Sequence, residues 1–112
     1  MPDRPDIPRP SPKTPYRVRA KNSQVEGDWH KLLRTHRDAA IRCWDHISAT
    51  PLSAIGTRYT PLKGSLKTCE FDGQQLPQWQ WELDARARVK VAIGKHFVVI
   101  MDVSTGHPKE NE

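Results

Sequence analysis

Basic side chains and one histidine near the C-terminus are the residues of this chain best suited to chemistry on phosphate. Arg86, Arg88 and Lys90 alternate with apolar residues, and His107 follows a little further along the chain. A guanidinium binds two phosphate oxygens in a fixed geometry, whereas an imidazole titrates near neutral pH and transfers protons. The alternative is that the same charges form the solvated outer face of a small sheet.

A strand hairpin must position these side chains. The alternation predicts a strand from Arg86 to Ile93 with its basic residues on one side, Gly94 marks a turn, and residues 97–103 form an almost entirely apolar second strand. A loop of residues 94–96 sets Ile93 opposite Phe97 and gathers the apolar side chains of both strands on one face.

In this register Arg88 lies opposite Asp102, and Arg86 lies opposite Ser104. A two-residue loop would instead place Arg88 beside Met101 and mix charged with apolar side chains on one face, so the pattern disfavours it. We therefore expect Arg86, Arg88 and His107 to converge at one end of the hairpin.

Length and composition restrict the class of protein. A chain of 112 residues and 12.8 kDa forms one domain with a modest core, and a net charge of +5 with a pI near 9.5 favours an anionic partner. Cys43 and Cys69 lack the spacing of a metal or redox motif, so we expect free thiols, although one disulfide stays possible. No apolar run reaches the roughly 18 residues of a membrane span, which predicts a soluble cytoplasmic protein.

The first half of the chain predicts a tail, a strand and two helices. Residues 1–15 are rich in proline and form a disordered tail, and residues 16–20 alternate as a short strand. A capping box at residues 23–26 starts the first helix, and a second start signal at residues 35–38 opens another that ends before Pro51. We predict a helical hairpin with Trp29 and Trp44 in its core, a single long kinked helix being the alternative.

The second half predicts a sheet. Residues 50–78 form a long loop with one irregular strand near residues 66–71, and residues 78–83 alternate so that Trp79, Trp81 and Leu83 share one face. The predicted fold class is α+β in the order β-α-α-β-β-β, with a small antiparallel sheet packed against the helical hairpin.

Several short motifs occur in an order that resembles the RelE/ParE superfamily of toxins from type II toxin–antitoxin systems. They are Trp29 to Leu32 at a helix start, the Pro-Leu-Lys-Gly turn at residues 61–64, the strand sequence Ala-Arg-Val-Lys-Val at residues 87–91, and Gly106-His107. The resemblance covers residues 16–109 as one RelE-like domain, which leaves residues 110–112 as a C-terminal tail. It implies a RelE-like fold and favours the branch that cuts mRNA in the ribosomal A site.

The resemblance also implies roles for individual residues. Arg88 and His107 would be catalytic, and Trp81, or alternatively Trp79, would stack on a base. Four further residues would bind RNA or phosphate: Lys63, Lys67, Arg86 and Lys109. Neither a metal nor another cofactor is implied, and the expected partners are a cognate antitoxin, the ribosome and mRNA, with no membrane.

This chain departs from the superfamily at two positions. Many ribosome-dependent members have a tyrosine near the C-terminus, where this chain has no aromatic residue after His107, and some have a glutamate where this chain has Thr60. Two alternatives therefore stay open: a ParE-like inhibitor of DNA gyrase, and a basic nucleic-acid-binding module without catalytic activity.

Overall fold

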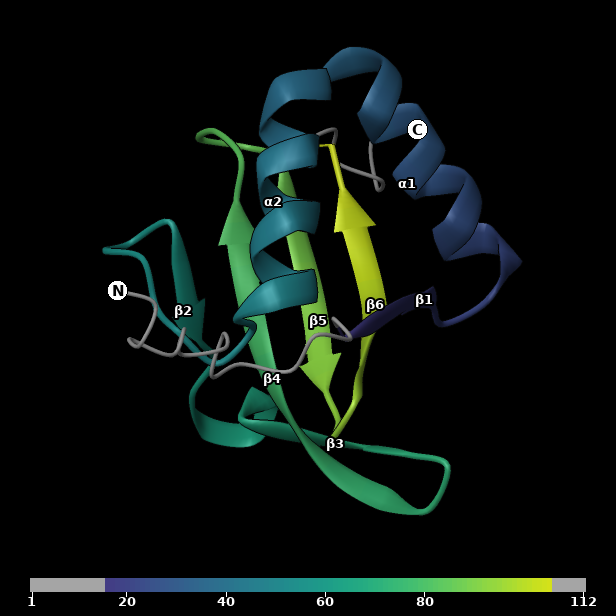
Figure 1. Ribbon diagram of the computed structural model, residues 1–112, viewed down its shortest axis with the longest axis vertical. Coiled ribbons are helices and arrows are strands. Elements are labelled where there is room, and N and C mark those ends of the chain that lie inside the picture. The colour runs from purple at the N-terminus through teal and green to yellow at the C-terminus, as the bar shows by residue number, and fades with distance from the viewer. Residues whose placement is uncertain (1–15, 106–112) are drawn as a thin grey trace, which may run out of the picture.

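Two helices pack on one face of a mixed sheet in the computed structural model, which describes residues 16–105 (Figure 1). The predicted tails, residues 1–15 and 110–112, lie outside the described residues. Along the chain the elements are β1 (Arg17–Ala20), α1 (Ser23–Thr35), α2 (Arg37–Ala49), β2 (Tyr59–Pro61), the 3-10 turn η1 (Gly64–Leu66), β3 (Thr68–Phe71), β4 (Gln74–Glu82), β5 (Arg88–Ile93) and β6 (Phe97–Ser104).

The sheet has the strand order β1-β6-β5-β4-β2, and β3 pairs with the first part of β4. The fold class is therefore α+β, as predicted, but the sheet is not purely antiparallel because β1 runs parallel to β6. Parallel neighbours require a long connection between them, and here everything from α1 to β5 separates the two strands in sequence.

The helical hairpin is confirmed, with small shifts at the helix starts. Asn22 caps α1, since its side-chain oxygen accepts a hydrogen bond of 2.9 Å from the Val25 amide, one residue before the predicted capping box. His36 ends α1 and begins α2. The Thr35 hydroxyl bonds back to the Lys31 carbonyl rather than capping the second helix.

Both helices bury one stripe of residues against the sheet. The core includes Leu32, Cys43 and Ile47 from the helices and Val89 and Val91 from β5. Trp29 packs against this core and is partly buried, but Trp44 is 43% exposed, so its predicted place in the core was wrong. Both tryptophans line a cavity beside β1 that no described side chain fills.

The register of the β5–β6 hairpin differs from the prediction. Ile93 pairs with Val98 rather than Phe97, and the Gly94 amide donates a hydrogen bond of 2.8 Å to the Phe97 carbonyl, which closes a longer turn. The longer turn shifts the ladder by one residue and an irregularity between Lys90 and Val91 shifts it by one more, so that Arg88 pairs with Ser104 rather than Asp102.

The β3–β4 hairpin explains why the binary pattern misled the register. We call the side of the sheet away from the helices the open face; by strand parity it carries Phe97 and Val99 of β6. The Phe71 ring of β3 lies 6.4 Å from the Phe97 ring, and Val99 is fully buried although it is outside the main core. Both faces of the sheet are apolar at this end, and alternation no longer identifies the core face.

The segment between α2 and β4 holds more regular structure than expected. The irregular strand near residues 66–71 is β3, whereas β2 was not predicted, and β4 begins at Gln74, before the predicted residue 78. The shared face of Trp79, Trp81 and Leu83 is confirmed, since all three are buried in the core. Within residues 16–105, neither helix combines the length and the apolar character needed to cross a membrane.

Candidate functional site

Arg88 begins β5 at the end of the open face that β3 leaves uncovered. Its position alternates with buried Ala87 and Val89, so its side chain lies on the face opposite the helices, as the sequence predicted. The side chain is about one-third exposed, and its guanidinium donates to the backbone carbonyls of Ala85 and Asp84 at 3.2 and 3.4 Å. Its Nε also lies 4.0 Å from a carboxylate oxygen of Glu82, the residue that pairs with it across the ladder.

The turn before Arg88 is organised by Asp84. One carboxylate oxygen accepts hydrogen bonds of 2.8 and 2.7 Å from the amides of Arg86 and Ala87, while the other lies 3.1 Å from the His36 ring. The amide hydrogen bonds from Ala87 and Arg86, followed by the contact with His36, lower the pKa of Asp84. Asp84 is thus held as a carboxylate that fixes the turn, and the turn fixes where β5 begins.

Arg58 is a second arginine at this end, which sequence reasoning missed. Its guanidinium donates to the carbonyls of Glu82 and Leu83 at 3.1 and 3.3 Å, and its own carbonyl accepts from the Glu82 amide. A cavity of about 440 Å³ lies against Arg58, Glu82 and Asp84. No local signal could have found this contact, because Arg58 and Glu82 are 24 residues apart in sequence.

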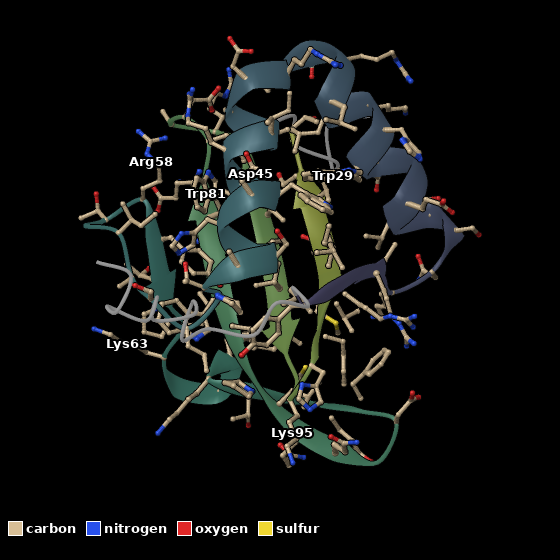
Figure 2. All side chains as sticks on the ribbon, viewed as in Figure 1. Trp29, Asp45, Arg58, Lys63, Trp81 and Lys95 are labelled. Atoms are coloured by element: carbon tan, nitrogen blue, oxygen red, sulfur yellow. The ribbon has the colours of Figure 1, made fainter. Side chains whose placement is uncertain are left out.

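Lys63 and Lys67 lie on another part of the sheet. They flank η1, one immediately before it and one immediately after, and both are exposed. We call residues 63–67 the lysine turn. Figure 2 shows Lys63 at the β2 edge of the molecule, the same edge as Arg58 but nearer the opposite end of β4.

The structure does not bring the lysine turn next to Arg88. The turn is bonded to β4 at Gln78, whereas Arg88 pairs with Glu82 of the same strand. These β4 positions are separated by about 13 Å at the rise of an extended strand. Arg86 is closer to Arg88, because it lies in the Asp84 turn with an exposed side chain. A ligand that contacts both the lysine turn and Arg88 therefore has to bridge these two positions on β4.

Trp81 is not available to stack on a base. It is only 3% exposed and packs against Tyr59 and His46, with ring centroids 5.5 and 5.7 Å away. Its alternation with polar residues on β4 directs it to the helix side of the sheet. The structure thus argues against the stacking role, because Trp81 is buried on the helix side of the sheet.

His107 and Lys109 lie outside the described residues, so the structure does not place the candidate general acid–base. The described part of β6 ends at Ser104, which pairs with Arg88. The strand that leads to His107 in the sequence therefore ends beside the arginine with which it was predicted to act.

Further cations extend over the open face from β1. Arg17, Arg19 and Lys21 are exposed and alternate with inward-facing Val18 and Ala20. The Arg19 guanidinium lies 5.7 Å from the centre of the Phe97 ring. This strand adds positive charge on the side of the sheet that carries Arg88.

The thiols have different surroundings. Cys43 is buried in the core, and burial raises its pKa to about 12, whereas Cys69 on β3 is partly exposed; both are free. Burial raises the pKa of Cys69, while Lys21 and Lys90 act in the opposite direction. Across residues 16–105, His, Cys, Asp and Glu side chains form no group of three or more able to hold a metal ion.

Comparison of this chain with protein-family models and with curated proteins finds no match. The candidate site therefore depends on the geometry of the open face and of the lysine turn.

Proposed function

We propose that this protein is the toxin of a toxin–antitoxin pair, with a RelE-like topology, and that it cleaves mRNA on the ribosome in the cytoplasm. The observation that carries the proposal is the position of Arg88, at the uncovered end of a basic sheet face and paired with Ser104, where β6 leads to His107. The order of elements along the chain further supports the proposal: β1 is followed by a helical hairpin and later by the antiparallel strands β4, β5 and β6.

The proposed reaction uses the substrate's own ribose. The 2′-oxygen attacks the adjacent phosphorus, the bond to the 5′-oxygen breaks, and the products are a 2′,3′-cyclic phosphate and a free 5′-hydroxyl. Negative charge grows on the phosphorane oxygens, and Arg88 would stabilise it through paired N–H donors. His107 would transfer one of the two protons that must move.

Arg88 needs to exchange partners in this mechanism. Its present acceptors are two carbonyls and, at 4.0 Å, one carboxylate, all near the protein surface. The phosphodiester anion of RNA, or the phosphorane formed from it, is a stronger acceptor than a neutral carbonyl. Substrate binding would therefore draw the guanidinium from the turn to the phosphate.

The test is induced expression of the parent chain, Arg88→Ala and His107→Ala, with growth followed and mRNA 5′ ends mapped. Arrest by the parent, cuts in translated frame, and relief by both substitutions are expected. Arg42→Ala is the matched control, because this exposed arginine lies on α2, in the helical layer and far from Arg88 in the sequence. Cleavage that persists in Arg88→Ala would overturn the proposed role of Arg88.

A second candidate is a gyrase inhibitor or nucleic-acid-binding protein without nuclease activity. It is favoured by the hydrogen bonds from the Arg88 guanidinium to the carbonyls of Asp84 and Ala85 in the preceding turn, because an arginine with a purely structural role would make such bonds. Growth arrest with gyrase-dependent DNA breaks and intact mRNA would select this candidate. Arg88→Ala would then reduce stability but leave any arrest in place once the protein is folded.

A further inference from the structure

We propose that the cavity beside the lysine turn binds one nucleotide of single-stranded RNA, with the base in the cavity and the flanking phosphates on Lys63 and Lys67. The inference rests on the proposed function for the identity of the polymer. It adds a base-binding subsite at the lysine turn, away from Arg88. At this turn the sequence indicated only phosphate contacts.

The cavity has the size and the surface for a base. Its volume is about 440 Å³, and its walls include Pro61, Leu62, Pro77 and Trp79. Small-molecule sites are typically concave and mainly apolar, with a few polar groups that set orientation. The apolar walls would cover the faces of a base, and the two lysines are the charged groups that line the same cavity.

Trp79 gives this cavity a rigid wall. One side of the indole is stacked on Tyr59, with ring centroids 4.9 Å apart and planes inclined by 28°. Tyr59 is itself fully buried and donates a hydrogen bond of 2.6 Å to the Pro51 carbonyl. The indole is therefore held in place before any ligand arrives, which lowers the entropic cost of binding.

The lysine turn is also fixed to the sheet. Gln78 accepts from the Leu62 amide at 2.9 Å and donates from its own amide to the Lys67 carbonyl at 3.0 Å. Its buried side-chain amide donates a third bond, of 2.9 Å, to the Leu66 carbonyl. These bonds hold the backbone at both ends of η1, so both lysine side chains extend from fixed backbone positions beside the cavity.

Charge selects a nucleotide over an apolar peptide as the occupant. Within the part of the chain that is described, neither Lys63 nor Lys67 forms an ion pair with a carboxylate, and both side chains are exposed. Two unpaired cations beside an apolar hollow complement an apolar ring carried on an anionic backbone. An apolar peptide would leave both charges without a partner.

The test measures binding without cleavage. Fluorescence anisotropy would measure the affinity of the Arg88→Ala protein, used as the background for further substitutions, for two labelled oligomers of equal length. One is a short 2′-O-methyl RNA, which lacks the attacking hydroxyl, and the other is its abasic counterpart. Substitution of both lysines by alanine should weaken binding of the base-containing RNA about tenfold or more. The slope of log affinity against log salt should fall by about one for each lysine.

Matched variants separate the base from the phosphates. Lys31→Ala removes an exposed lysine from α1 and should leave affinity unchanged. RNA should change the tryptophan fluorescence of the parent but not of Trp79→Phe, provided that circular dichroism shows the variant folded. Equal affinity for the abasic oligomer, or no loss with the double lysine variant, would overturn the inference. Neither result depends on cleavage, so the proposed nuclease activity stands or fails separately.

Discussion

The Nε2 atom of His36 lies 3.1 Å from a carboxylate oxygen of Asp84, which joins the junction of the two helices to the turn that precedes Arg88. The two residues are 48 positions apart, and both side chains are partly exposed. Because Asp84 also caps the amides of Arg86 and Ala87, this single carboxylate connects the helical layer to the start of β5.

Replacement of Asp84 by asparagine should change how stability depends on acid pH. The folded-state pKa of Asp84 is lowered, chiefly by the Ala87 and Arg86 amides, so its charge stabilises the fold above the usual carboxyl pKa near 4. That contribution is lost as pH falls through the lowered pKa. Denaturant unfolding at several pH values should show Asp84→Asn less stable at pH 6, with the difference shrinking below about pH 4. A pH-independent difference would contradict this account.

Tyr59→Phe should destabilise the fold without altering its shape. The substitution leaves the buried Pro51 carbonyl without the hydrogen bond of 2.6 Å that it now accepts. An unsatisfied buried acceptor costs about 1–3 kcal/mol in the free energy of unfolding. Tyr16→Phe is the control, because within residues 16–105 its hydroxyl has no such bond, and a change of less than about 0.5 kcal/mol is expected. Equal effects of both substitutions would refute the role of this bond.

The native protein should expose one reactive thiol. Cys43 is fully buried with a pKa raised to about 12, whereas Cys69 is partly exposed on β3. The thiolate is the reactive form, so an aromatic disulfide reagent at pH 8 should label Cys69 first and Cys43 only after unfolding. In the Cys69→Ser variant, the remaining thiol of Cys43 should be labelled only after denaturant is added. Rapid labelling of that variant under native conditions would show that the helical layer opens locally.

Leu32→Ala should cost far more stability than Leu52→Ala. Leu32 is fully buried in the core, whereas Leu52, just beyond α2, is 57% exposed. The buried truncation loses contacts and leaves a cavity, at about 2–5 kcal/mol, while the exposed one should change stability by about 0.5 kcal/mol or less. Chemical denaturation of both variants measures the difference. Similar values would mean that α1 is not packed on the sheet as described.

Glu82→Gln should leave stability nearly unchanged but strengthen RNA binding. Its contact with Arg88 is 4.0 Å long, and both side chains are substantially exposed, so solvent screening limits the pair to less than about 1 kcal/mol. Without the carboxylate, Arg88 is freer to bind phosphate, and affinity should rise by up to roughly fivefold. Oligonucleotide titration of protein with and without the substitution measures this. Weaker binding would indicate that Glu82 positions Arg88 for its ligand.

Local patterns predicted the parts of this fold that depend on near neighbours in sequence. The break between the helices at His36 was predicted from the start signal at residues 35–38. The buried face of Trp79 and Trp81 and the outward position of Arg88 follow from strand periodicity, which requires only that one side of a strand be apolar.

Features that depend on distant segments could not be read in the same way. Arg58 meets Glu82, and His36 meets Asp84, through folding of the chain rather than through any local spacing. Trp44 lies on a helical stripe, yet it is exposed and lines the cavity beside β1, where no side chain of residues 16–105 covers it.

The sequence by itself determined an α+β chain with a helical hairpin, an alternating basic strand and an excess of positive charge. Tertiary structure decided the register of Arg88 with Ser104, which depends on the longer turn and on the irregularity between Lys90 and Val91. The sequence pattern misses this register because β3 covers the open face near Phe97 and removes the contrast on which alternation depends. It also decided the separation of the lysine turn from Arg88, since pairing with β4 places them at Gln78 and Glu82. Periodicity reports which face of a strand is buried, whereas register and spacing depend on which other segments pack against it.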